Sequence, residues 1–228
     1  MLACLHARLR RCFLSRSLCT TLKRYCSGGE LQEQLEAQPP LPCPPPFPER
    51  VARFTPDRAR ELTVEMLGAL NYLHKNGVVH RDLKLENYIF TGPGKGEGQL
   101  KLIDFGLSRA CIEGETMTTN VGSVIFKAPE VMAGAGYGTE SDMWSLGVIC
   151  HMLVTGLVPW EGDNRAEIEA AITKESSNPD GLMGLLMWFY ESCKVPMDCQ
   201  DFLLYVGRKS PLATKNLLVV TDGLRRPP

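Results

Sequence analysis

The stretch HRDLKLENYIF, residues 80–90, constrains this chain most. It places an acid, a cation and an amide within eight residues, as Asp82, Lys84 and Asn87, and it ends in a β-type run. A second β-type run, LKLI at 100–103, follows after a glycine-rich loop. Two short runs joined by such a loop predict a β-hairpin.

The loop between the two runs, TGPGKGEGQ, has a second interpretation. Glycine-rich loops can hold phosphate groups, but this one opens no helix and does not have the spacing G-x-G-x-x-G. The turn of a hairpin is therefore the prediction for residues 91–99.

A helix is predicted before the hairpin. The pair Thr55-Pro56 is typical of a helix start, apolar residues then recur on one face, and Asn76-Gly77 ends the helix.

An apolar helix is predicted after the hairpin, from Thr139 to about Gly156, with Asp142 as the second member of a capping box. Its apolar stretch approaches the length of a membrane span, but it contains polar residues and its flanks are not basic, so a buried helix is predicted. Further helices are predicted near 163–174, 198–207 and 212–220.

Four short motifs occur in a fixed order along the chain. They are HRDLK with Asn87, then DFG at 104–106, then APE at 128–130, then SDMWSLGV from Ser141. Each motif alone is weak, but the ordered set with a strand–turn–strand after the first is very specific. The set resembles the catalytic half of a eukaryotic protein kinase, over about residues 27–220. The resemblance implies an α+β, mainly helical fold: the large, C-terminal lobe with a small β-hairpin element.

The resemblance assigns chemical roles. Phosphoryl transfer needs positioning and charge neutralisation, so Asp82 is expected to be the catalytic base and Lys84 to balance charge on the transferring group. Asn87 and Asp104 carry the hard oxygen atoms that suit Mg²⁺, with ATP as the donor. The alternative for Asp82 is an ordinary turn aspartate.

Lys84 within HRDLK resembles the serine/threonine form of the family, whose substrates are protein Ser and Thr hydroxyls. Ser123 stands where that form has a threonine that bridges the base and the lysine. Arg81, before the base, implies an activation loop that responds to negative charge.

That activation loop is predicted over about residues 107–127, with Thr116, Thr118 and Thr119 as candidate phosphorylation sites. Glu113 and Glu115 are alternative sources of negative charge, and a third possibility is that all five are simply solvated.

Structural roles are implied for Glu130 and Asp142. In the family the glutamate of APE pairs with a later arginine, which is not at its usual place after Ala213; Arg208 is a possible substitute. In the family, the aspartate in the position of Asp142 holds the backbone of the catalytic loop, which here is the segment that begins with HRDLK at His80. A role as a helix cap is possible in addition.

The segment YCSGGEL, residues 25–31, is similar to the one that follows the hinge in calcium/calmodulin-dependent and calcium-dependent protein kinases. The similarity implies that Cys26 lies near the adenine end of the nucleotide cleft and Glu30 near the ribose or substrate. A simple turn at Gly28-Gly29 is the alternative.

The domain organisation predicted is a basic leader at 1–24, a partial kinase domain at 25–220 and a tail at 221–228. The leader has six basic residues and no acid, which fits an amphipathic helix, a targeting peptide or a solvated tail. The proline-dense segment 38–48 is predicted to be an extended loop. The glycine-rich loop and strand lysine of a small lobe are not found, so the N-terminal lobe is expected to be absent.

Composition narrows the surroundings. A net charge of −1 gives no support for nucleic-acid binding. Nine cysteines without a C-x-x-C pair favour reduced thiols in an intracellular, cytoplasmic protein, although organellar targeting by residues 1–24 stays open. A large lobe without its small lobe would expose apolar surface, which a partner could cover.

Three hypotheses for function follow. The first is a serine/threonine protein kinase that depends on ATP and Mg²⁺, and that is weak on its own because small-lobe elements are missing. The second is a catalytically inactive binding or regulatory protein derived from a kinase. The third is a fragment of a longer, active kinase.

Overall fold

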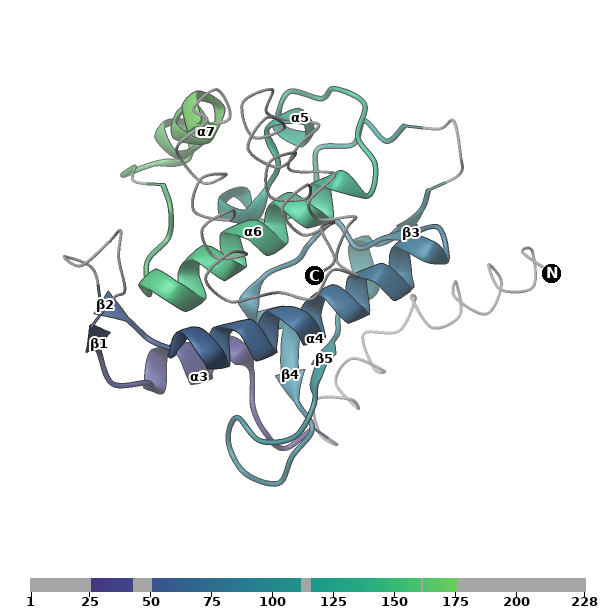
Figure 1. Ribbon diagram of the computed structural model, residues 1–228. Coiled ribbons are helices and arrows are strands. Elements are labelled where there is room, and N and C mark those ends of the chain that lie inside the picture. Colours follow the sequence, from purple (N-terminus) through teal and green to yellow (C-terminus); the bar gives the residue numbers. More distant parts are fainter. Residues whose placement is uncertain (1–25, 43–50, 112–115, 161, 176–228) are drawn as a thin grey trace, which may run out of the picture.

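The computed structural model describes residues 26–42, 51–111, 116–160 and 162–175 (Figure 1). Within these ranges the chain is mainly helical, with three two-stranded sheets. The predicted leader, the helices at 198–207 and 212–220, and the tail lie outside the described residues. The helices are α3 (Leu31–Ala37), α4 (Pro56–Lys75), α5 (Pro129–Met132), α6 (Glu140–Thr155) and α7 (Arg165–Glu175). The strands are β1 (Leu41–Pro42), β2 (Val51–Ala52), β3 (Val78–Val79), β4 (Tyr88–Phe90), β5 (Leu100–Leu102) and β6 (Arg109–Ala110).

Helix α4 confirms the prediction made from its end signals. Thr55 is the N-cap, and its side-chain oxygen accepts the backbone N–H of Arg58 at 3.3 Å. Gly77 follows the helix with a φ of 67°, a left-handed conformation that glycine adopts without strain. The buried face of α4 contacts α6 and β5, so this helix lies beside the hairpin that carries the motifs (Figure 1).

The predicted hairpin is confirmed as the antiparallel pair β4–β5, in which Tyr88 is opposite Leu102 and Phe90 is opposite Leu100. The predicted turn is also confirmed, since the backbone N–H of Thr91 donates to the carbonyl of Gln99 at 3.0 Å. The free edge of β4 is paired with the segment before α3, where the backbone N–H of Gly28 donates to the carbonyl of Phe90 at 3.1 Å. Strand β4 is therefore hydrogen-bonded on both of its sides.

Helix α6 is the central helix of the core. Every residue from Ser141 to Thr155 is buried, as expected for a helix that is apolar on all sides. No helix in the described part of the chain is long and apolar enough to cross a membrane. The predicted end is confirmed, since Gly156 is the C-cap with a φ of 69°.

The capping box predicted at the start of α6 is wrong. Thr139 has helical backbone angles and makes no side-chain hydrogen bond to the helix. Glu140 and Ser141 instead bind the backbone of Gly138, at 2.9 and 2.8 Å. The Asp142 carboxylate does not accept a hydrogen bond from Thr139, because it accepts the backbone N–H groups of residues 80 and 81 instead.

Two tryptophans join α6 to the segment before α5. The rings of Trp144 and Trp160 are stacked, with centroids 5.7 Å apart and an angle of 5° between their planes. The indole N–H of Trp160 donates to the carbonyl of Ile125 at 2.8 Å. The stack therefore holds the segment 123–127 against the core.

Helix α3 and the strands β1 and β2 were not predicted from the sequence. Leu31 and Leu35 are buried and anchor the short helix α3. The part of the proline-dense segment that is described, residues 38–42, is extended, as predicted, but Leu41–Pro42 pairs with Val51–Ala52. Both strands of a two-stranded ribbon are edge strands, where proline is tolerated.

Candidate active site

Asp82 is oriented by two neighbours. Its Oδ1 accepts the backbone N–H of Ser123 at 3.0 Å and the Ser123 hydroxyl at 3.1 Å. The Nζ of Lys84 lies 3.6 Å from its Oδ2; the Asp82 side chain is 13 % exposed and the Lys84 side chain 25 %. One carboxylate oxygen is thus held by protein donors, while the other lies beside a cation at the surface.

Gly122 makes this close approach possible, and sequence reasoning missed it. Its φ is 92°, and a Cβ added there would lie 2.5 Å from the carbonyl oxygen of Arg81. Any larger residue would push Ser123 away from Asp82. The sequence signal was the Gly-Ser pair that follows the candidate threonines.

Asn87 and Asp104 lie at one end of the hairpin. The side-chain Nδ2 of Asn87 donates to the backbone carbonyl of Asp82 at 2.8 Å. The backbone carbonyl of Asn87 accepts the N–H of Ile103 at 2.8 Å. Asp104 is exposed and has a φ of 61°; its Oδ1 accepts the N–H of Gly106 at 3.3 Å. Because the Asn87 amide is fixed through its nitrogen, its oxygen remains for another ligand. The donor chemistry, one amide oxygen and one carboxylate, fits Mg²⁺.

Asp142 anchors the catalytic loop. Its buried carboxylate accepts the backbone N–H groups of His80 and Arg81, each at 2.8 Å. The Nε2 of His74, on α4, lies 2.9 Å from the same carboxylate. The loop is therefore tied to the two central helices through one side chain.

Arg81 has a φ of 69°, which is unusual for a residue with a side chain. The two bonds of Asp142 and the contact of Gly122 fix the backbone on both sides of this strained position. Its guanidinium donates to the carbonyl of Leu107 at 2.6 Å and to the hydroxyl of Tyr137 at 3.5 Å. Arg81 therefore reaches the predicted activation loop, through neutral oxygen atoms in the described residues.

His80 is buried directly behind the catalytic loop. Its Nε2 lies 3.1 Å from the carbonyl oxygen of Ile103, and its ring meets the edge of Phe105 at a centroid distance of 5.1 Å. Burial lowers the pKa of His80 below 6.5, and outweighs the opposite effect of the Asp142 carboxylate. The imidazole is neutral in the folded protein near pH 7.

This burial predicts a pH dependence of stability. Because His80 has a lower pKa folded than unfolded, the unfolded chain binds more protons just below pH 6.5, so the unfolding free energy falls as pH falls. The slope from His80 is at most about 1.4 kcal/mol per pH unit. Urea unfolding at several pH values should show a smaller slope for His80→Gln than for the wild type. Equal slopes would show that folding does not change the protonation of His80 in this pH range.

The three candidate phosphorylation sites, Thr116, Thr118 and Thr119, are exposed. The backbone around them is held against Tyr137, whose hydroxyl donates to the carbonyl of Thr119 at 2.7 Å. Their hydroxyls are not brought to Asp82 by any contact in the described residues. The alternative charges Glu113 and Glu115 lie outside the described residues.

Cys26 and Glu30 lie on the segment that pairs with β4, and Glu30 forms a backbone bridge with Ile89. Both are partly buried, and their expected roles at the nucleotide stay predictions. Glu130 is partly buried in the first turn of α5. The usual place of the arginine expected to pair with Glu130, after Ala213, and its possible substitute Arg208 both lie outside the described residues.

A profile described as "Protein kinase domain" matches residues 7–209 of the chain. The chain belongs to the protein kinase family. The kinase match begins within the segment 1–24, so the boundary predicted after residue 24 stays a prediction. Protein kinases transfer the γ-phosphoryl group of ATP with the help of Mg²⁺.

Individual kinases are also similar to the chain. "NUAK family SNF1-like kinase 2" of Rattus norvegicus is 33 % identical over 181 residues, which cover 77 % of this chain and 26 % of that protein. "Calcium-dependent protein kinase 22" of Oryza sativa subsp. japonica is 38 % identical, over 67 % of this chain and 24 % of the relative. "Serine/threonine-protein kinase ppk25" of Schizosaccharomyces pombe is 37 % identical, over 68 % and 33 %. The chain thus spans about a quarter to a third of these relatives, and the resemblance to calcium-dependent kinases is confirmed.

Proposed function

We propose that this kinase transfers the γ-phosphoryl group of ATP to serine or threonine hydroxyls of proteins, with Asp82 as the catalytic base. The observation that carries the proposal is the orientation of Asp82. Because Ser123 occupies Oδ1 with two hydrogen bonds, Oδ2 is the oxygen that can accept the proton of a substrate hydroxyl.

The neighbours of Asp82 support the same reaction. Lys84, 3.6 Å from Oδ2, lies where its charge can balance that of a phosphoryl group approaching the hydroxyl. Asn87 and Asp104 would hold Mg²⁺, which when bound neutralises charge on the phosphates. Asp142 keeps the loop rigid, so that the base does not need to be reorganised during the reaction.

We also propose that residues 1–228 by themselves are slow. The sequence contains neither G-x-G-x-x-G nor a V-A-I-K strand, the elements that position the phosphates in kinases. Misplacement alone can cost about 100-fold in rate. Phosphorylation of a serine/threonine peptide library by purified 1–228 tests this. A rate of about 1–100 s⁻¹, as in typical kinases, would contradict the proposal that residues 1–228 are slow. Loss of that rate in Asp82→Asn would support the role of Asp82 as the base.

Two alternatives remain distinct from this proposal. In the first alternative, the chain is a catalytically inactive, regulatory protein of kinase descent. In the second, it is a segment of a longer kinase, whose remaining residues supply the other elements. The presence of Asp82, Lys84, Asn87 and Asp104 favours the second of these over the first, because a purely regulatory protein would not need the full set. Transcript sequences that continue upstream of Met1 and encode a V-A-I-K strand would support it.

Binding of nucleotide separates catalysis from a purely regulatory role. We expect ATP with Mg²⁺, at about ten times its dissociation constant, to raise the melting temperature by about 3–5 °C. Asp104→Asn should abolish the part of this shift that depends on Mg²⁺, because a metal ligand is lost. Asp163→Asn, at an exposed aspartate of the α7 region, is the matched control and should behave as wild type. The regulatory alternative predicts no shift in any of the three proteins.

A further inference from the structure

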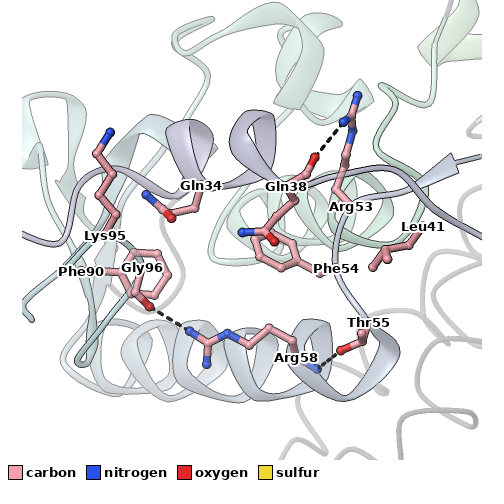
Figure 2. A pocket seen from close by; sticks show the side chains of 10 residues that line it. All are labelled: Gln34, Gln38, Leu41, Arg53, Phe54, Thr55, Arg58, Phe90, Lys95 and Gly96. Carbon is pink, nitrogen blue, oxygen red and sulfur yellow. Dashed lines mark hydrogen bonds between the residues drawn. The ribbon is translucent and has the colours of Figure 1, made fainter.

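A pocket of about 270 Å³ lies between α3, the start of α4 and the β4–β5 turn (Figure 2). Neither the catalytic loop nor the Asp104 turn contributes to its lining. Nothing in the proposed phosphoryl transfer uses this pocket.

The lining of the pocket is positively charged. It includes Arg53, Arg58 and Lys95, and no acidic residue. In Figure 2, Arg58 extends along the pocket from α4 to Gly96, with Lys95 and Arg53 toward opposite ends of the view. The pocket also meets the N-terminal end of the 20-residue helix α4, whose dipole favours anions.

The two arginines keep donors available. Arg58 donates one nitrogen to Glu61 at 3.0 Å and another to the carbonyl of Gly96 at 3.3 Å. Arg53 donates one nitrogen to the carbonyl of Gln38 at 2.9 Å. A guanidinium has five N–H donors, so both side chains are held in place and can still bind a carboxylate.

Gln34 adds a donor on the wall opposite Arg58. Its side chain is 6 % exposed, and its Nε2 is buried without a hydrogen-bond partner in the described part of the chain. A buried donor without a partner destabilises a protein. Rotation about the last torsion of glutamine is soft, so this amide can turn to an acceptor placed in the pocket.

Apolar side chains line the pocket beside these charges. Phe54 is buried, and the ring of Phe90 lies 5.8 Å from the guanidinium carbon of Arg58. The volume is below the roughly 300–1,000 Å³ of sites for drug-sized ligands, which favours one or two amino-acid side chains over a nucleotide. We propose that this pocket docks an acidic segment of a partner protein, with a glutamate or aspartate on the arginines and an adjacent apolar side chain on the phenylalanines.

A labelled peptide tests the proposal directly. Fluorescence anisotropy of purified 1–228 would compare a fluorescein-labelled peptide of alternating glutamate and leucine with its glutamine counterpart. We expect the glutamate peptide to bind at least about tenfold more tightly, since 1.4 kcal/mol, one charge-assisted hydrogen bond, is tenfold. No binding, or equal binding of both peptides, would overturn the proposal.

Matched charge reversals localise the site. Lys95→Glu should weaken binding of the glutamate peptide at least about tenfold, because it places a carboxylate in the pocket. Lys101→Glu is the control: Lys101 is an exposed lysine of the same hairpin that does not line the pocket. Equal losses in both variants would mean attraction to overall charge and would reject a pocket. Full displacement of the peptide by an equal concentration of free glutamate would also reject protein docking, in favour of a small-anion site.

Gln34→Leu separates binding from structure. Removal of a buried donor without a partner should raise the melting temperature by about 2–4 °C while it weakens binding of the glutamate peptide. A glutamine with a purely structural role would give the opposite, a lower melting temperature with unchanged binding.

Discussion

Asp142→Ala is expected to lower the free energy of unfolding by about 4 kcal/mol. The change leaves two backbone N–H groups and the imidazole of His74 without their acceptor, and one buried donor left unpaired costs about 1–3 kcal/mol. Urea unfolding followed by circular dichroism measures the loss. Asp142→Asn should lower the free energy of unfolding by less, because the amide oxygen of asparagine can still accept some of these hydrogen bonds.

Glu140→Ala is the matched control for Asp142. Glu140 is an acid in the same first turn of α6, and its one described bond is to the N–H of Gly138. Its loss should cost about 1 kcal/mol, the usual value of a helix-terminal bond. If both alanine variants lost the same amount, Asp142 would be acting only as a helix-terminal acid and not as the anchor of the loop.

Asp82→Asn is expected to reduce the rate of peptide phosphorylation about 10²–10⁴-fold, the usual contribution of a general base. The effect should appear in 1–228 or in any longer chain that carries these residues. Stability should change little, because the amide oxygen of asparagine can still accept from Ser123. Single-turnover kinetics with radiolabelled ATP, together with a melting curve, measure both quantities.

Two further variants sharpen this test. Asp57→Asn removes an exposed carboxylate in the first turn of α4 and should leave the rate unchanged. Ser123→Ala removes one of the two bonds to Oδ1 and should reduce the rate less than Asp82→Asn, by about tenfold. A full rate in Asp82→Asn would show that this carboxylate is not the base.

The parts of the fold that were predicted correctly are those with local signals. Thr55, Gly77 and Gly156 mark helix ends through backbone geometry that neighbouring residues dictate. The hairpin was likewise encoded by two short runs and a glycine-rich turn. Such features need no knowledge of distant contacts.

The parts that were missed depend on distant contacts. Helix α3 is too short to be stable alone and exists because Leu31 and Leu35 pack into the core. The capping box failed because Asp142 binds a backbone 61 and 62 residues away. Gly122 was missed although the Gly-Ser pair offered a signal, because the steric conflict that requires a glycine is with Arg81 on another loop.

The site was predicted in a similar way. Asp82, Asn87 and Asp104 were proposed because they lie in the motifs that resemble protein kinases, and Ser123 because it stands where the serine/threonine form has a threonine; their roles stay predictions. Lys127 was missed: it is buried, its Nζ donates to Asn120 at 2.7 Å, and burial lowers its pKa. The sequence alone does not show that a lysine next to the APE motif is buried in the folded protein.

The stacked tryptophans give the protein an optical reporter. Trp160 bonds to the carbonyl of Ile125, two residues after the serine that holds the base, and its ring lies on Trp144 of the central helix. Any rearrangement of this segment, whether caused by substrate, phosphorylation or heat, must change the stacking or the polarity around the indoles. Conformational changes beside Asp82 are therefore readable as a spectral shift without any added dye.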